Sequence, residues 1–167
     1  MFDALPAVID PLRLADEGAR LCGELKLQGM PRLTGLCADA QGMASIDWQF
    51  ERSAQGLRQM HGSVRATVRV ICQRCLQPFA LTLGTDTRLV VLNPGETGAN
   101  DEADVLEAKP WLLSELVENE LLLAMPMIPM HAPGECQARV PGSSDKAGRS
   151  DRRHPFAVLG KLKHGDN

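Results

Sequence analysis

The chain has 167 residues, of which 44% are hydrophobic and 23% are charged, a composition typical of one globular domain with or without a trailing segment. A chain of this length can bury about 70% of the surface that it exposes when unfolded, so it can form a core without disulfides. The formal net charge of -3 excludes the strongly basic composition of a general nucleic-acid-binding domain.

The first elements predicted along the chain are two strands, over residues 32–37 and 45–50. Both segments are rich in hydrophobic residues, and the sequence Asp39-Ala40-Gln41-Gly42 between them is typical of a turn. Trp48 and Phe50 fall in apolar patterns and are expected in the core, as are Cys22 and Cys37 as small buried residues.

Residues 57–92 have a hydrophobic period of two and predict further antiparallel strands. Val64, Ala66, Val68 and Val70 alternate with polar residues, so one face of the first strand meets the core and the other faces away from it. Residues 79–83 repeat the pattern, residues 88–92 continue as another extended run, and residues 72–78 form the connection. We expect a sheet of about four to six strands that could curl toward a barrel.

The next segment, residues 93–110, is acidic and lacks periodicity, which predicts a flexible loop in solvent. Pro110 then suits the first turn of a helix over residues 111–124. Leu116 and Leu121 belong to its apolar stripe, and Glu118 falls on the opposite side together with Glu115. Glu120 falls within the stripe, where a carboxylate is costly unless it has a partner.

The predicted fold class is α+β, an antiparallel and potentially barrel-like sheet with this helix packed on it. We expect one domain over residues 1–138. Residues 139–167 predict a flexible tail, because 139–152 are rich in Pro, Gly and Ser; a short apolar and basic segment at 155–163 could dock on the body or on a partner.

The cysteine content and the N-terminal sequence favour a cytoplasmic protein. Five cysteines, an odd number, do not suggest a secreted disulfide framework. No basic residue precedes Arg13 and no long apolar run occurs near the N-terminus, so we expect no signal peptide. The longest apolar stretch, residues 121–130, is interrupted by two prolines and is too short for a membrane span.

The pair Cys72-x-x-Cys75 is the sharpest local feature. Two thiolates at this spacing can bind one Zn²⁺, and His131 with Cys136 could complete a tetrahedral set. The alternative without metal is a pair of reduced, half-buried thiols. A thiol redox site at Cys72 and Cys75 is a further alternative, although a strand rather than a helix is predicted to follow the motif.

Three arginines, Arg65, Arg69 and Arg74, could form a basic strip on the outer sheet face and bind RNA phosphate or a protein partner. They could equally pair with the acidic region that follows, over residues 91–120. Residues 51–90 carry six basic and two acidic groups, whereas residues 91–138 carry one and nine. The chain has no Tyr and few other aromatic residues, so recognition by base stacking is not expected.

The sequence contains no Walker-type loop, no H-E-x-x-H, no G-x-S-x-G and no dinucleotide-binding fingerprint. An enzymatic function therefore has no support from these motifs, and no small-molecule substrate is expected.

Several blocks of the sequence resemble the bacterial YceD family, the large ribosomal RNA subunit accumulation proteins. They are C-Q-R-C-L-Q-P-F within residues 68–79, E-N-E-L-L-L-A-M-P within 116–126, His131 and Cys136, P-F-A-V-L at 155–159, and Leu162-Lys163. The blocks occur in the order found in the family. Some relatives carry additional cysteines near the C-terminus that look like a fuller zinc site, where this chain has only His131 and Cys136.

The resemblance implies a non-enzymatic ribosome-biogenesis factor that supports synthesis, processing or stability of 23S ribosomal RNA. Such a factor would bind pre-ribosomal RNA or a ribosomal or maturation protein. Two alternatives remain: a thiol redox protein that uses Cys72 and Cys75, and a zinc-stabilised interaction module without a ribosomal role.

Overall fold

The computed structural model describes residues 5–39, 41–96 and 104–136. The elements in chain order are β1 (Val8–Ile9), α1 (Pro11–Glu17), β2 (Arg20–Lys26), the 3₁₀ turn η1 (Leu27–Gly29), α2 (Pro31–Thr34), β3 (Met43–Arg52), β4 (Arg58–Ile71), β5 (Pro78–Leu92), β6 (Asp104–Glu107), β7 (Trp111–Leu112) and α3 (Leu113–Ala124). The α+β class predicted from the sequence is confirmed. The expected tail, residues 139–167, lies outside the described residues.

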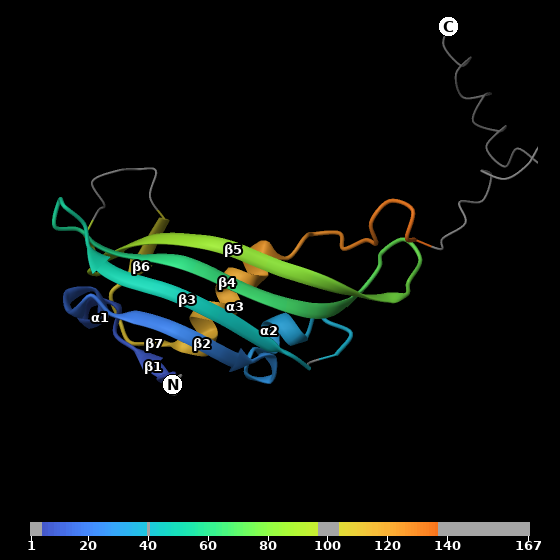
Figure 1. Ribbon diagram of the computed structural model, residues 1–167, viewed down its shortest axis with the longest axis horizontal. Helices are drawn as coiled ribbons and strands as arrows, with labels where there is room; N and C mark the ends of the chain where they lie inside the picture. The colour runs from blue at the N-terminus through green and yellow to red at the C-terminus, as the bar shows by residue number, and fades with distance from the viewer. Residues whose placement is uncertain (1–4, 40, 97–103, 137–167) are drawn as a thin grey trace, which may run out of the picture. The chain divides into compact units, whose positions relative to one another are not determined.

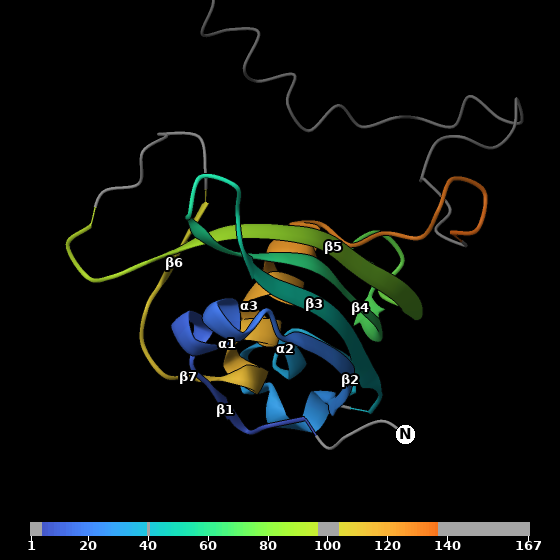
Figure 2. The same cartoon turned by 60° about the vertical axis from the view of Figure 1, so that its left-hand side comes forward.

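A five-stranded sheet in the order β2-β3-β4-β5-β6 is the main layer, and β1 pairs with β7 in a separate two-stranded sheet. Strands β2 to β5 pair antiparallel, the arrangement that was predicted for residues 57–92, and the long hairpin of β4 and β5 aligns Val68 with Leu81. The last strand, β6, is parallel to β5. Within the described residues the large sheet stays open, with β2 and β6 at its edges; it curves over the helices without closing into a barrel (Figure 2).

The alternating pattern of the strands separates a buried face from an outer face on which none of the described helices packs. The core side of β3 and β4 carries fully buried apolar side chains, among them Trp48, Phe50 and Val64. Helix α3 lies across this inner face and packs on β4 and β5, with α2 beside it (Figure 1). The outer face carries mostly polar side chains, so burial on one face fixes the register of every strand.

Three segments differ from their predictions, two in the type of element and one in its first residue. Residues 32–37 form helix α2 and a turn instead of a strand, because Pro31 occupies the first helical position and the first-turn N–H groups bond to a distant carboxylate. The predicted loop 93–110 contains β6, whose Leu106 is buried against the core. Helix α3 begins at Leu113 instead of residue 111, since Trp111 and Leu112 pair with β1.

Of Cys22 and Cys37, which were both expected in the core, only Cys37 lies against it. Cys37 is half-buried and packs against the core, whereas Cys22 is exposed. It lies on β2 opposite Asp47 of β3, in register with the polar outer face. A small apolar side chain at this edge strand therefore does not mark the core.

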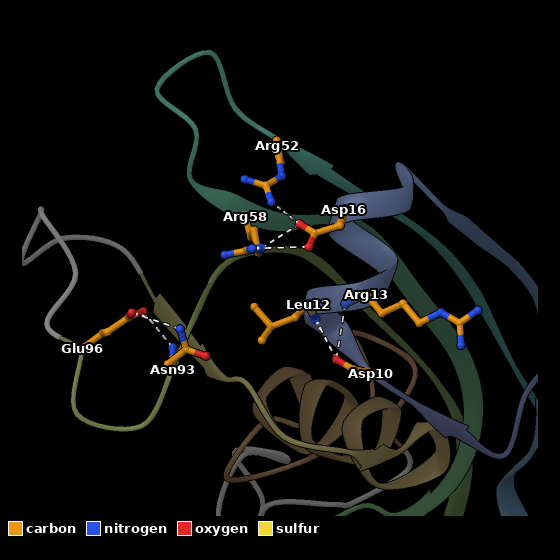
Figure 3. A network of polar contacts seen from close by, with 8 residues as sticks. All are labelled: Asp10, Leu12, Arg13, Asp16, Arg52, Arg58, Asn93 and Glu96. Carbon is orange, nitrogen blue, oxygen red and sulfur yellow. Dashed lines mark hydrogen bonds and ion pairs between the residues drawn. The ribbon is translucent and has the colours of Figure 1, made fainter.

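Helix α1 is fixed to the hairpin ends by charged groups (Figure 3). Its N-cap residue Asp10 accepts hydrogen bonds from the N–H groups of Leu12 and Arg13. At the other end of the helix, Asp16 binds Arg58 and Arg52, each with a nitrogen–oxygen distance of 2.7 Å. These contacts join α1 to the strand ends that border the β3–β4 turn.

Candidate functional site

The connection between β4 and β5 is a tight turn that places two thiols together. The N–H of Cys72 donates to the carbonyl of Gln77 over 2.9 Å, and the N–H of Leu76 donates to the carbonyl of Cys72, also over 2.9 Å. Leu76 has a φ of 58°, in the left-handed region that side-chain-bearing residues seldom adopt. The turn therefore closes on itself around the Cys72-x-x-Cys75 pair, at one end of the hairpin.

A second segment reaches this turn from the end of α3. After the helix ends at Ala124, the chain runs to Pro129, whose carbonyl accepts a hydrogen bond of 2.9 Å from the N–H of Gln73. The ring of His131 packs on Phe79 at the start of β5, with ring centroids 4.6 Å apart. The turn and the segment after α3 are thus held side by side.

The four predicted metal ligands, Cys72, Cys75, His131 and Cys136, meet at this junction. Their donor atoms all lie within 4.8 Å of one another. The Sγ atoms of Cys72 and Cys136 are 3.9 Å apart, and the Sγ of Cys75 is 3.4 Å from Nδ1 of His131. Ideal bond lengths to zinc imply tetrahedral edges of about 3.8 Å between two sulfurs and about 3.6 Å between sulfur and nitrogen. These two distances are close to the edges of a tetrahedral site, so the donor set is compatible with one tetrahedral metal ion.

The backbone around the cluster favours a thiolate at Cys72, which is fully buried. Burial opposes ionisation of this thiol, but N–H groups of His131, Cys75 and Arg74 donate to it and together lower its pKa to about 5. For Cys75 the N–H of Gln77 acts to lower the pKa, but burial and the neighbouring sulfurs of Cys136 and Cys72 outweigh it and raise the pKa. Clustered thiols that repel a second negative charge are stabilised when a cation binds between them.

The arginines predicted for the outer face lie where the alternation placed them. Arg65 and Arg69 are exposed on β4, and Arg74 is exposed in the turn that carries the cysteines. Arg65 approaches Asp86 at 3.9 Å and Arg69 approaches Asp39 at 3.8 Å, both long and solvent-accessible ion pairs.

These two partners are not in the acidic region 91–120 that the sequence suggested. Asp86 lies on β5, the strand paired with β4, and Asp39 precedes β3. Because exposed pairs of this length contribute little stability, the guanidinium groups can exchange partners for a ligand.

Two carboxylates of α3 are buried, and the sequence predicted only one of them to face the core. Glu118, predicted on the polar side, is 3% exposed and accepts hydrogen bonds from the backbone N–H groups of Arg32 and Leu33. Glu120 is 8% exposed, as its place in the apolar stripe implied, and its partner is the hydroxyl of Thr87, which donates a hydrogen bond to it. The sequence carried no signal for Glu118, because its partners lie in a segment predicted to be a strand.

Among the described residues, no helix combines the length and the apolar character that crossing a membrane requires.

Comparison with known proteins identifies the family. Residues 60–163 match the family model described as "Large ribosomal RNA subunit accumulation protein YceD", and the matched region includes the cysteine turn, α3 and all four candidate ligands. The chain is also 30% identical over 172 aligned residues to the protein of that name from Haemophilus influenzae, covering 95% of this chain and 96% of the relative. No solved structure shows significant similarity. On this similarity and on the order of its sequence blocks, the chain belongs to the YceD family.

Proposed function

We propose that this protein supports the accumulation of large-subunit ribosomal RNA as a non-enzymatic binding factor. The observation that carries the proposal is the match to a relative named for that role, which extends over nearly the whole of both chains. The factor would act on synthesis, processing or stability of 23S ribosomal RNA, through contact with pre-ribosomal RNA or with a ribosomal or maturation protein. The cytoplasm, where ribosomes are assembled, is the expected compartment.

The outer face of the sheet is the proposed contact surface. Arg65 and Arg69 project from alternate positions of β4, about 13 Å apart along the strand, and Arg74 follows in the turn at its end. The structured helices pack on the opposite face (Figure 1). A row of weakly paired guanidinium groups on an uncovered face is suited to phosphate or carboxylate recognition. Because the whole chain is acidic, this contact would be local and sensitive to salt.

The cellular test compares precursor and mature 23S ribosomal RNA in a strain that lacks the protein with those in the parent strain. We expect a selective loss of the mature species, restored by the wild-type gene. A variant with Arg65→Glu, Arg69→Glu and Arg74→Glu should restore it poorly, whereas Arg13→Glu on α1 should restore it fully. Unchanged ribosomal RNA in the deletion strain would contradict the proposed function, and full rescue by the triple variant would contradict the proposed surface.

We further propose that the cluster of Cys72, Cys75, His131 and Cys136 holds one structural Zn²⁺. Three sulfurs and one imidazole nitrogen are a donor set typical of structural zinc, and the four donors leave no coordination position open for catalysis. The ion would join the β4–β5 turn to the segment that follows α3, next to Arg74. Zinc would thereby fix the conformation of this end of the contact surface.

The test of the zinc proposal is the metal content of the full-length protein purified without chelators. We expect about one zinc per chain for the wild type, and a loss of zinc in Cys75→Ser. Cys22→Ser is the matched control, because Cys22 is exposed and outside the cluster, and this variant should keep its zinc. Zinc near zero in the wild-type protein, or equal zinc in both variants, would contradict the proposal.

The thiol redox alternative has less support from the geometry. Reactive thiols are partly exposed and often lie at the start of a helix, whereas Cys72 is fully buried and strand β5 follows the motif. A low pKa at Cys72 also suits a metal ligand, which must be a thiolate. Unaltered 23S ribosomal RNA in cells that carry Cys75→Ser would exclude a dithiol mechanism, because that chemistry requires both thiols.

A further inference from the structure

A pocket of about 530 Å³ lies between β5, β6 and helix α3, and none of the clustered cysteines lines it. Leu89, Leu106 and Leu116 contribute apolar surface to it, and Trp111 adds an aromatic ring. Glu120 and Thr87 also line the pocket, and both are more than nine-tenths buried. Pockets with apolar walls and a few buried polar groups are typical of ligand sites.

The carboxylate of Glu120 has one partner within the described residues. Its Oε2 accepts a hydrogen bond of 2.6 Å from the hydroxyl of Thr87, and no described Lys, Arg or His forms an ion pair with it. The other buried carboxylate of the same helix, Glu118, is by contrast paired with Arg32 and two backbone N–H groups. A buried carboxylate without a cation is unfavourable, and a cation that enters the pocket would remove that cost.

The remaining charges of the pocket favour the same kind of ligand. Asp86, Asp104 and Glu107 line it in addition to Glu120, against a single basic residue, Arg88. Lys109 pairs with Glu107 at 2.7 Å and Arg65 approaches Asp86, so Asp104 and Glu120 are the lining carboxylates without an ion pair among the described residues. Their negative potential attracts a cation and repels phosphate. The Nζ of Lys109 lies 4.5 Å from the centre of the Trp111 ring, so one face of this ring already holds a cation. The leucines offer contact to the aliphatic stem of a ligand. A guanidinium on a three-carbon chain combines these features.

Two exposed apolar side chains at the pocket indicate that the guanidinium belongs to a protein. Val105 is 54% exposed and Leu123 is 81% exposed, and both line the pocket. Apolar residues at the edge of a charged pocket are a feature of protein interfaces, in which a buried arginine often serves as the anchor. An RNA partner would instead bring phosphate groups to the acidic residues.

We propose that this pocket binds an arginine side chain of a protein partner, with Glu120 as the residue that recognises the guanidinium. The inference that this site binds a cation depends only on the residues that line the pocket. That the partner is a protein of the assembling ribosome rests on the proposed function. The protein would then have two contact surfaces, the arginines of the outer sheet face and this acidic pocket at the β6 edge.

The test is a titration of the ¹⁵N-labelled full-length protein with Nα-acetyl-arginine amide, followed by NMR. We expect saturable shifts at Thr87, at Glu120 and at the indole N–H of Trp111. The citrulline analogue, which has the same shape without the charge, should bind at least tenfold more weakly. Glu120→Gln should weaken arginine binding at least tenfold, because the amide retains an acceptor for Thr87 but has no charge. Glu115→Gln, the same change at an exposed position of α3, should bind as the wild type does.

Equal binding of the arginine and citrulline compounds, or equal binding by wild type and Glu120→Gln, would overturn the proposal. A short single-stranded RNA that shifts the same resonances more strongly than the arginine compound would also overturn it, in favour of an RNA site. Thermal unfolding of Glu120→Gln separates a lost contact from a lost fold, and Thr87→Val provides a second variant that removes the other polar group. Because the titration contains no ribosomal component, its failure is distinguishable from failure of the ribosomal RNA test above.

Discussion

The substitution Glu118→Ala should be among the most destabilising single changes in α3. The Oε1 atom of Glu118 accepts hydrogen bonds of 2.6 Å and 3.0 Å from the backbone N–H groups of Arg32 and Leu33, which open helix α2. Removal of the carboxylate leaves two N–H donors without an acceptor, each at a cost of about 1–3 kcal/mol. We therefore expect the free energy of unfolding to fall by about 3–5 kcal/mol, a large part of the stability of an ordinary domain.

The partner variant separates the role of the backbone hydrogen bonds from that of the ion pair. The side chain of Arg32 is 53% exposed, so its guanidinium can regain water when the carboxylate is lost. Arg32→Met leaves Glu118 bound to both N–H groups but removes its cation, and should cost about 1–3 kcal/mol, less than Glu118→Ala. Glu115→Ala, at an exposed position of the first turn, should stay within about 1 kcal/mol of the wild type.

Urea unfolding of the four proteins, followed by circular dichroism, measures these differences as shifts in the midpoint at an unchanged slope. A loss below about 1 kcal/mol in Glu118→Ala would refute the assignment of this carboxylate as the cap of α2. Equal losses in Glu118→Ala and Arg32→Met would show that the ion pair, and not the capping of the backbone, stabilises the contact.

Three further predictions concern packing, strand pairing and acid stability. Leu121→Ala should destabilise the protein by about 2–5 kcal/mol and Leu123→Ala by less than about 0.5 kcal/mol in urea unfolding, because only Leu121 is buried. Gly62→Ala should cost about 4 kcal/mol or more, or prevent folding, since a Cβ at its φ of 147° would lie 2.0 Å from a carbonyl oxygen of β3; a soluble variant with wild-type stability would disprove this close approach. The hydrogen bond from Arg58 lowers the pKa of Asp16, so its stabilising contribution is present above the unfolded-state pKa of about 3.9 and is lost as the pH falls through the lower folded-state pKa. Asp16→Asn should therefore unfold more readily than the wild type near neutral pH, with a difference that disappears under acid; a difference independent of pH would contradict this.

Local pattern was sufficient to predict strands β3, β4 and β5 and the main helix α3. The alternation of Val64, Val68 and their neighbours identified the hairpin of β4 and β5 and the face that it buries, because a strand has a side-chain period of two whatever its surroundings. The apolar spacing identified α3 to within two residues of its start. Pattern failed at α2 and β6, which have four residues each and are too short for a period to be distinguished. Helix α1 and strand β2, of seven residues each, were not predicted either.

Two neighbouring carboxylates of α3, Glu118 and Glu120, show how far the sequence could predict the candidate sites. Its sequence placed Glu120 among apolar neighbours correctly, since that position depends only on helical geometry. It placed Glu118 on the exposed side, because nothing in the helix itself indicates that α2 packs there. An amphipathic pattern describes one helix, whereas burial depends on every element that covers it.

The sequence was sufficient for strands β3 to β5, helix α3, the Cys72-x-x-Cys75 pair and the family, because each depends on residues that are close together or on whole-chain similarity. Only the tertiary structure decided that His131 lies beside Cys75 across 56 residues, and that Glu118 caps a helix 86 residues earlier in the chain. It also decided which buried carboxylate lacks a cation and opens to a pocket. Such contacts depend on the path of the chain between the two residues. The entropic cost of closing a loop rises only slowly with its length, so a separation of 86 residues costs little more than one half as long. The spacing in the sequence therefore does not show which residues will be partners.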